Sequence, residues 1–329
     1  MPKIVRYGLL STATIGLFAH LPASKLSANS DIVAVSSRSM DAATAAAERH
    51  GIPLAFGNYE DMLVSEEIDA VILTLPNALH HEWAIKAALA GKHVLCEKPL
   101  AATLAEAREM AKIAKAQGVV LVEGFTPRGT MQLRKVRDLV AQDTIGDILR
   151  VDASAAFRCD DPGDIRFSKA MAGGSLMDVG CYGVNAARFV MNAEPMQAMG
   201  FECRRRGAEV DTSFSGLLQF PSGAVAHIWS SLESDPASQF KVTGTRGAIV
   251  LSQLSDESAS ITIAAQGGEE VLTMQSPNRF AVQLDAFSNC VLSGKPPEFP
   301  AEDGARNMAA IEALYQSAQT GQAVDVERI

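Results

Sequence analysis

The chain has 329 residues, of which 47% are hydrophobic and 20% are charged, and its 38 acidic residues outnumber its 29 basic ones to give a net charge of −9. A chain of this length is expected to form two domains, and the excess of negative charge argues against a nucleic-acid partner. No apolar run approaches the roughly 20 residues that span a bilayer, so no membrane partner is expected.

The N-terminus and the cysteines predict the location of the protein. The first residues contain no apolar signal-peptide core and no small-residue cleavage site. The five cysteines are widely spaced and include no Cys-x-x-Cys pair. This pattern is typical of a reduced intracellular protein without structural zinc, so we expect a cytoplasmic protein.

Short apolar runs alternate with segments of helical period up to about residue 124, as in repeated βαβ units. The predicted strands are Ile4–Leu10, Asp31–Ser36, Ala70–Leu75, His93–Cys96 and Val119–Glu123. The predicted helices follow the first loop to about Ser27 and then cover Met40–His50, Tyr59–Val64, His80–Ala90 and the segment from Thr103 to Gln117. Residues 1–124 are therefore expected to form an α/β Rossmann domain that binds NAD(P).

Beyond Phe125 the apolar residues recur with a period of two. The predicted strands are Ile148–Phe157, Met196–Cys203, Phe214–Phe220, Gly223–Leu232, Phe240–Thr243 and Ala248–Leu251. Helices are predicted at Gln132–Ala141, Gly173–Met191, Phe280–Leu292 and Ala305–Gln319. Residues 125–329 are expected to form an α+β domain with a large, mostly antiparallel open sheet, which binds substrate and mediates oligomerisation.

The strand predicted at Gly223–Leu232 carries apolar side chains on both faces. They are Val225 and Trp229 on one face, and Ala226, Ile228 and Leu232 on the other. A sheet that is covered on one side only does not need this pattern. We infer that a second copy of the chain covers the other face, in a homodimer or a homotetramer.

The loop after the first strand reads Ser11-x-Ala13-x-x-Gly16, where a Rossmann domain has Gly-x-Gly-x-x-Gly. Small residues let backbone N–H groups at the helix N-terminus approach a pyrophosphate. The pattern alone fits an ordinary tight turn about as well, but its place in the first βαβ unit favours a cofactor site. The expected cofactor contacts in this loop are Ser11, Thr12, Ala13, Thr14 and Ile15.

The second strand ends at Ser36-Ser37-Arg38, where an NAD-specific domain usually presents Asp or Glu to the ribose hydroxyls. Arg38 can instead pair with a 2′-phosphate that Ser37 also hydrogen-bonds, so NADP is the favoured cofactor and NAD the alternative. The competing interpretation is a solvated arginine at a helix start.

Leu75, Pro76, Asn77 and His80 follow the third buried strand and are expected along the nicotinamide half of the ligand crevice. Asn77 could equally cap a helix, and His80 could equally be an ordinary residue of its first turn. His80-His81 does not have the spacing of metal ligands, and no cluster of His, Asp or Glu complements it, so no metal is expected.

The next strand ends in Glu97-Lys98-Pro99. Ligands of open α/β sheets bind outside the carboxyl ends of the strands, and Pro99 restricts the backbone that delivers Lys98 there. We expect Glu97 and Lys98 to contact the cofactor. A lone Glu-Lys pair is more often a solvated surface turn, and it is the setting in the chain that favours a site.

A helix over Gly173–Met191 would place Asp178, Tyr182, Asn185 and Phe189 on one face. A helix that only packs would hardly need an aspartate there. Tyrosine, with an ordinary pKa of about 10, exchanges protons near neutral pH only beside a positive charge, which Lys98 could supply. Taken alone, Tyr182 would be interpreted as a core residue.

Together these motifs resemble the Gfo/Idh/MocA family of oxidoreductases over nearly the whole chain. The resemblance rests on Gly8–Ala13, Thr74-x-Pro76-Asn77-x-x-His80, Gly91–Pro99, Gly173-Gly174 with Asp178-x-Gly180-x-Tyr182, Val242–Gly247, and Glu302-Asp303-Gly304. Many members carry His where this chain has Tyr182, and the Tyr version is similar to the branch of glucose–fructose oxidoreductase, aldose dehydrogenases and dihydrodiol dehydrogenase, which mostly use NADP.

The resemblance implies that Lys98, Asp178 and Tyr182 are catalytic and contact a sugar-like substrate. It makes Arg166 a candidate contact for substrate hydroxyls. Thr126-Pro127-Arg128 departs from the commoner Tyr-Arg phrase of the family, which leaves the role of Arg128 open.

Two functions from different classes are compatible with this resemblance. The first is an NADP-dependent oxidoreductase that moves hydride between nicotinamide and a sugar-like carbinol or lactol, or its ketone or lactone. The second is a silent dinucleotide-binding sensor, similar to a repressor of galactose metabolism. Retention of Lys98, Asp178 and Tyr182 favours the enzyme.

Overall fold

The computed structural model describes residues 4–205, 207–254, 256–265 and 267–329. The chain divides into two compact units. The first comprises Met1–Gly124 and Phe280–Ala305, and the second comprises Phe125–Arg279 and Arg306–Ile329. The expected division into 1–124 and 125–329 differs from this in one segment, because Phe280–Ala305 packs with the first unit.

The segment joins the first unit through helix α8 (Arg279–Ser293). Its buried side chains Ala281, Leu284 and Phe287 belong to one hydrophobic cluster with strand residues such as Tyr7. The hydroxyl oxygens of Tyr7 and Ser288 are 2.6 Å apart. These contacts join residues more than 270 positions apart, which explains why local periodicity did not reveal them.

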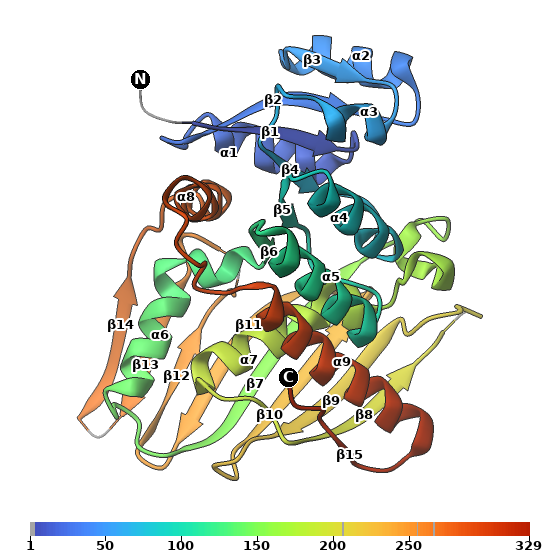
Figure 1. Ribbon diagram of the computed structural model, residues 1–329. Helices are drawn as coiled ribbons and strands as arrows, with labels where there is room; N and C mark the ends of the chain where they lie inside the picture. The colour runs from blue at the N-terminus through green and yellow to red at the C-terminus, as the bar shows by residue number, and fades with distance from the viewer. Residues whose placement is uncertain (1–3, 206, 255, 266) are drawn as a thin grey trace. The chain divides into compact units, whose positions relative to one another are not determined.

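Within its described residues the first unit contains a six-stranded parallel sheet in the order β3-β2-β1-β4-β5-β6, as Figure 1 shows. Its strands are β1 (Val5–Leu10), β2 (Ser30–Ser36), β3 (Leu54–Phe56), β4 (Ala70–Leu73), β5 (His93–Cys96) and β6 (Leu121–Glu123). Every residue of β4 is buried, as expected for an inner parallel strand. The predicted Rossmann sheet is confirmed.

The helices of the first unit begin and end near their sequence signals. Ser39 caps α2 and Gly51 ends it in the left-handed region, while Thr103 and Glu106 form a capping box at the start of α5. The helical segments are the π-helix η1 (Gly16–His20), α1 (Leu21–Ser24), α2 (Met40–His50), α3 (Tyr59–Val64), the 3₁₀ turn η2 (Asn77–Leu79), α4 (His80–Leu89) and α5 (Leu104–Gln117).

Nine strands among the described residues form the sheet of the second unit, in the order β14-β13-β12-β11-β7-β10-β9-β8-β15. Among these described strands only β7 and β10 pair in parallel, so the predicted mostly antiparallel sheet is confirmed. The strands are β7 (Ile148–Arg158), β8 (Gln197–Cys203), β9 (Ser213–Gln219), β10 (Val225–Ser231), β11 (Glu233–Gly244), β12 (Gly247–Leu251), β13 (Ser260–Ala265), β14 (Gly268–Thr273) and β15 (Val324–Asp325).

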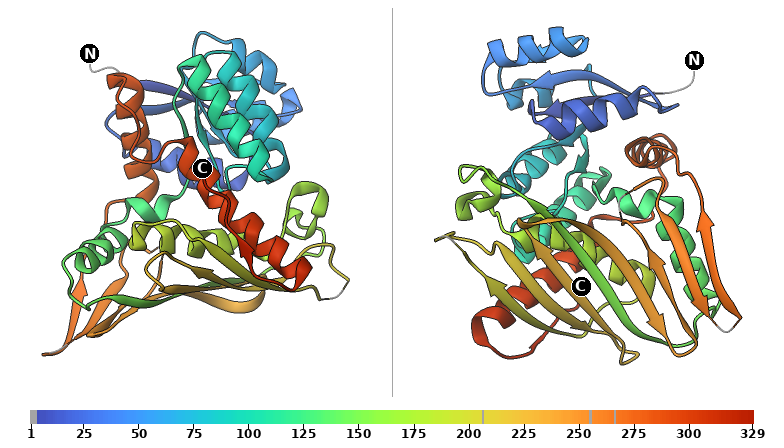
Figure 2. Two further views of the ribbon diagram at one scale, coloured as in Figure 1. Left: turned by 60° about the horizontal axis from the view of Figure 1, so that its bottom comes forward. Right: turned by 180° about the vertical axis from the view of Figure 1, so that it is seen from behind.

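Helices cover one face of this sheet, and the opposite face is seen without a helix from behind (Figure 2). The helical segments are η3 (Thr126–Gly129), α6 (Met131–Ala141), η4 (Ile165–Phe167), η5 (Lys169–Met171), the π-helix η6 (Leu176–Gly180), α7 (Cys181–Met191) and α9 (Ala301–Thr320), within which the boundary between the units falls.

The segment formed by η6 and α7 lies close against the sheet because two glycines face it. A Cβ atom on Gly180 would lie 2.9 Å from Ser230 Oγ, and one on Gly183 would lie 3.0 Å from Ala153 Cβ. Larger residues would push the helix away from β7 and β10. The glycine of the Asp178-x-Gly180 motif therefore has a packing role.

Candidate active site

The loop after β1 adopts the backbone of a glycine-rich loop although it has serine at the first position. Ser11 has a φ of 129°, in the region that favours glycine. Its hydroxyl offsets this strain through local hydrogen bonds: Ser11 Oγ lies 2.8 Å from Thr74 Oγ1 and accepts the Ala13 N–H at 3.1 Å.

This loop is open to a ligand. Thr14 and Ile15 are exposed, Thr12 and Ala13 are half-buried, and no side chain caps the start of η1. An uncapped helix start behind small residues can receive an anion on its backbone N–H groups. The residues present therefore fit a dinucleotide pyrophosphate.

Arg38 lies exposed just beyond the end of β2, beside half-buried Ser37. Burial raises the pKa of Tyr59, and the positive charge of Arg38 opposes this rise, which places Arg38 near Tyr59. Ser36, Ser37 and Ser39 surround it in sequence and no carboxylate does. This end of the strand suits a phosphate better than bare ribose hydroxyls.

Pro76 and Asn77 are half-buried at the carboxyl end of β4, whereas His80 is fully buried. His80 Nδ1 lies 2.9 Å from the Pro99 carbonyl oxygen, and Nε2 lies 2.8 Å from that of Leu75. Both nitrogens thus face backbone carbonyl oxygens just beyond the ends of β4 and β5, and the neutral ring can donate to one of them at a time. Of the two interpretations open for His80, its burial favours that of an ordinary packed residue. The alternative raised for Asn77 was a helix cap, but no side-chain hydrogen bond caps the start of η2 or α4.

Burial lowers the pKa of His80, although the two carbonyls raise it. Below pH 6.5, which is about the ordinary pKa of histidine, His80 is protonated in the unfolded chain more readily than in the folded protein. We therefore expect the free energy of unfolding to fall as the pH drops below about 6.5. The slope attributable to His80 is at most about 1.4 kcal/mol per pH unit. Urea unfolding between about pH 5 and 8 measures it.

His80→Gln should remove this slope, and His81→Gln, at the half-buried neighbouring position, should retain it. An unchanged slope in His80→Gln would assign the acid lability to other groups.

Glu97 and Lys98 follow β5 directly, and Lys98 is half-buried. The peptide bond between Lys98 and Pro99 is cis. Glu97 Oε1 lies 2.6 Å from His20 Nε2, and the Lys98 N–H donates to Glu97 Oε2 at 3.4 Å. Burial alone would raise the pKa of Glu97, but the hydrogen bond to His20 and the charge of Lys98 lower it below its usual range.

His20 is a residue of this site that the sequence interpretation missed. It ends the π-helix η1 and is fully buried. The sequence signal is weak, since a single histidine four residues after Gly16 looks like any other helical residue. Its contact with Glu97 joins positions 77 residues apart.

In the second unit, the helix that carries Asp178 and Tyr182 is otherwise buried. From Gly174 to Val190 only Asp178, Val179 and Tyr182 are partly exposed. The segment is not one α-helix as expected, because Leu176–Gly180 forms a π-helix before α7 begins. π-Turns of this kind occur frequently at functional sites.

Arg166 and Asp178, both predicted site residues, are brought together. Arg166 Nε donates to Asp178 Oδ2 at 2.8 Å, and Arg166 Nη1 donates to both carboxylate oxygens of Asp164 at 3.1 Å. Burial alone would lower the pKa of Arg166, but the carboxylates of Asp178 and Asp164 outweigh it and raise the pKa above its ordinary value. The guanidinium is therefore held as a cation beside Asp178.

The ring of Tyr182 packs edge to face on Phe125, with 5.5 Å between the ring centroids. The Arg128 guanidinium carbon lies 5.5 Å from the centroid of the Phe125 ring, and Arg128 is only 4% exposed. Arg128 thus belongs to the packing behind Tyr182, in the phrase that departs from the family pattern.

Asp211 holds the N-terminal end of this helix and was not predicted. It accepts hydrogen bonds from Ser175 Oγ at 2.7 Å, from the Leu176 N–H at 2.8 Å and from the Tyr315 hydroxyl at 2.7 Å. Burial raises the pKa of Asp211 although these donors lower it. Gly174 is required here, since its φ is 118° and a Cβ would lie 2.2 Å from Asp211 Oδ1.

Among the described residues, no group of three or more His, Cys, Asp or Glu side chains is arranged to hold a metal ion. In the same part of the chain, no helix combines the length and the apolar character needed to cross a bilayer.

The fold and these loops define the class of NAD(P)-binding oxidoreductases. Residues 5–125 match the model of an oxidoreductase family with an NAD-binding Rossmann fold, and residues 133–250 match the GFO/IDH/MocA C-terminal domain. The chain belongs to the Gfo/Idh/MocA family, which confirms the resemblance drawn from its motifs.

Curated relatives match nearly the whole chain. A D-xylose 1-dehydrogenase (NADP(+)) from Haloferax volcanii is 35% identical over 98% of this chain and 99% of its own length. A dTDP-3,4-didehydro-2,6-dideoxy-α-D-glucose 3-reductase from Actinomadura kijaniata is 30% identical over 96% of each chain.

Among solved structures, an aldose–aldose oxidoreductase from Caulobacter crescentus in complex with glycerol is similar with a TM-score of 0.92. It is 29% identical, and the match covers 98% of this chain and 100% of that one. A 3-ketoreductase from Actinomadura kijaniata in complex with NADP and TDP-benzene has a TM-score of 0.90 and 28% identity, over 96% and 98% of the two chains.

Proposed function

We propose that this protein is an NADP-dependent oxidoreductase that transfers hydride between nicotinamide and a CH–OH carbon of a sugar-like substrate, or the corresponding carbonyl. One observation carries the proposal. In a chain similar along its length to sugar oxidoreductases, Asp178 and Tyr182 are the partly exposed polar side chains of an otherwise buried helix.

The first unit would hold the cofactor. The N–H groups of the loop Ser11–Ile15 would bind the pyrophosphate, and Ser37 with Arg38 would bind the 2′-phosphate. Pro76, Asn77 and Glu97 would line the nicotinamide side, with His80 keeping the ends of β4 and β5 together from behind. When bound, the nicotinamide supplies or accepts the hydride.

Arg38→Ala is expected to lower the preference for NADP over NAD by about 10- to 100-fold, because each tenfold corresponds to about 1.4 kcal/mol and a charge-assisted phosphate contact is lost. Comparing kcat/KM for both cofactors in the wild type and the variant measures the change. Arg49→Ala, at another exposed position near the end of α2, should leave the ratio unchanged. A wild type that prefers NAD would contradict the assignment.

We propose that Tyr182 exchanges the proton of the substrate oxygen, that Lys98 stabilises the resulting negative charge, and that Asp178 orients a substrate hydroxyl. A proton must leave that oxygen as hydride leaves carbon, and the same group returns it in reduction. Arg166, paired with Asp178, would contact a further hydroxyl.

The alternative function is a sensor that binds dinucleotide without turnover. Absorbance of the reduced nicotinamide with a panel of aldoses, diols and ketones distinguishes the two. Turnover of any member supports the enzyme, whereas tight NADP binding without turnover across the panel would support the sensor. The identities of the family relatives favour the enzyme.

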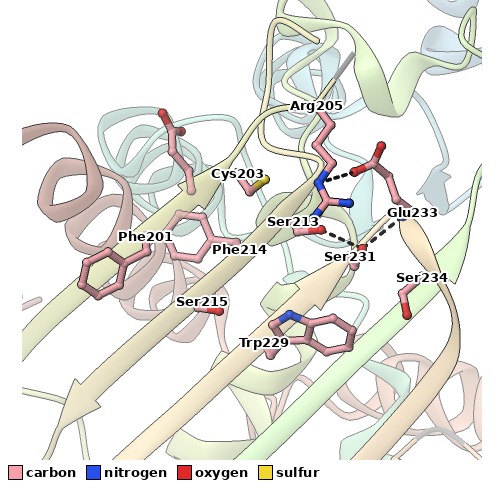
Figure 3. A pocket seen from close by; sticks show the side chains of 11 residues that line it. Phe201, Cys203, Arg205, Ser213, Phe214, Ser215, Trp229, Ser231, Glu233 and Ser234 are labelled. Atoms are coloured by element: carbon pink, nitrogen blue, oxygen red, sulfur yellow. Dashed lines mark hydrogen bonds and ion pairs between the residues drawn. The ribbon is translucent and has the colours of Figure 1, made fainter. Parts of the chain in front are cut away.

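We propose that the helix-free face of the nine-stranded sheet is covered by a second copy of this chain. Phe201 and Leu217, on β8 and β9, are 60% and 42% exposed there. Phe201 and Trp229 belong to the lining of a hollow of about 390 Å³. Figure 3 shows these two side chains with the others that line it. Large apolar side chains around a hollow on one sheet face are typical of an interface.

Sedimentation velocity at micromolar concentration should therefore show a dimer or a tetramer, and Phe201→Glu should shift it toward the monomer. Val64→Glu, at a position that is 76% exposed in the first unit, serves as the control. A monomeric wild type would refute the interface. We propose a cytoplasmic location, since the five cysteines are widely spaced and form no disulfide among the described residues.

A further inference from the structure

His20 and Glu97 form a buried pair directly behind the Lys98 turn. The His20 side chain is 1% exposed and that of Glu97 is 12% exposed, and 2.6 Å separates Nε2 from Oε1. The His20 ring also packs edge to face on Phe280, with 5.0 Å between centroids. Both partners therefore have little freedom to rotate, and the pair lies entirely within the first unit.

The geometry determines which nitrogen carries the shared proton. An ionised carboxylate only accepts hydrogen bonds, so His20 Nε2 must donate to Glu97. His20 Nδ1 is buried without a hydrogen-bond partner among the described residues. The Glu97 carboxylate thus accepts a hydrogen bond from a ring whose position is fixed by packing.

Lys98, His80 and Cys96 are among the groups close enough to interact with the charge of the Glu97 carboxylate. Lys98 follows Glu97 directly in the chain, and its backbone N–H donates to Glu97 Oε2 at 3.4 Å. The positive charge of Lys98 lowers the pKa of Glu97. By the same interaction, the Glu97 carboxylate favours the charged form of Lys98.

We propose that His20 is a positioning residue that holds the Glu97 carboxylate in one orientation beside Lys98, and that this carboxylate keeps Lys98 in its ammonium form. The inference deepens the proposed function, in which Lys98 acts as a cation. It can nevertheless be measured on the charge of Lys98 without any turnover.

The test uses two amide variants that differ in which ring nitrogen they replace. Glutamine places its NH₂ near the position of Nε2 and can still donate to Glu97, whereas asparagine reaches only the position of Nδ1. Lys98 is labelled with acetic anhydride across a range of pH and quantified by mass spectrometry, since only the unprotonated amine reacts.

The midpoint of Lys98 labelling should shift to lower pH by about one unit in His20→Asn and stay at the wild-type value in His20→Gln. Turnover on the best substrate of the panel should follow the same order, with at least a tenfold loss of kcat in His20→Asn. A wild-type midpoint in both variants would reduce His20 to a packing residue and overturn the proposal.

Glu97→Gln provides a second measurement if His20→Asn fails to fold. It removes the carboxylate directly and should shift the midpoint in the same direction, and an unchanged midpoint would again overturn the proposal. If no protein of the series turns over any substrate but the labelling shifts as expected, the proposed function fails while the inference about His20 stands.

Discussion

Replacing Tyr182 with phenylalanine should lower kcat by about 10²–10⁴-fold, the range that a general acid–base group contributes. The variant keeps the ring that packs on Phe125 and removes only the hydroxyl, so the helix should stay in place. Because the loss falls on the step that moves the proton, NADP binding should change little. Steady-state kinetics on the best substrate, with a fluorescence titration of NADPH, measures both quantities.

Tyr59→Phe is the matched control, because Tyr59 lies in the first unit and packs on Trp83. It should retain wild-type kcat. If Tyr182→Phe mainly raised KM and retained kcat, the tyrosine would only position the substrate oxygen, and Lys98 would be the group that transfers the proton.

Lys98→Met should cause a loss of kcat in the same range of about 10²–10⁴-fold. Methionine keeps the length and the apolar stem of the side chain and removes its charge. The buried Glu97 carboxylate would then lose a neighbouring cation that lowers its pKa, so the Glu97–Pro99 turn should also lose stability. Single-turnover kinetics and thermal unfolding report on these two effects separately.

Lys112→Met, at an exposed position of α5, should leave both measurements at wild-type values. Near-wild-type turnover in both Lys98→Met and Tyr182→Phe would show that the site has been misplaced. The carboxyl end of β5 would then have only a structural role.

The elements that the sequence predicted best are those with local signals at their ends. Helix α2 has both predicted bounds, since Ser39 caps it and Gly51 ends it. Strand β14 was not predicted, because Gly268–Thr273 is largely exposed and lacks an apolar face. Strand β13 was also missed, although Ile261 and Ile263 alternate along it as buried residues. The first helix was expected to be α-helical throughout, and its π-turn has no sequence rule comparable to a cap.

The candidate site could be predicted residue by residue but not as a network. Lys98 and Asp178 were accessible because they lie at a strand end and on a helix face. His20 and Asp211 could not be predicted from local sequence. The partner of His20 is 77 positions away, and the partners of Asp211 are 35 or more positions away. The φ of Ser11 was equally hidden, because side-chain hydrogen bonds replace the glycine that such a backbone normally requires.

The π-turn at Leu176–Gly180 sets the angle between the side chains on its two sides, among them the candidate site residues Asp178 and Tyr182. An α-helix advances by about 100° per residue, so deleting one residue from this turn would rotate everything before the deletion by about that angle relative to α7. If the deletion fell between Asp178 and Tyr182, the two would be three residues apart instead of four, with both side chains chemically intact. The length of this turn thus sets the angle between the two side chains independently of their identity.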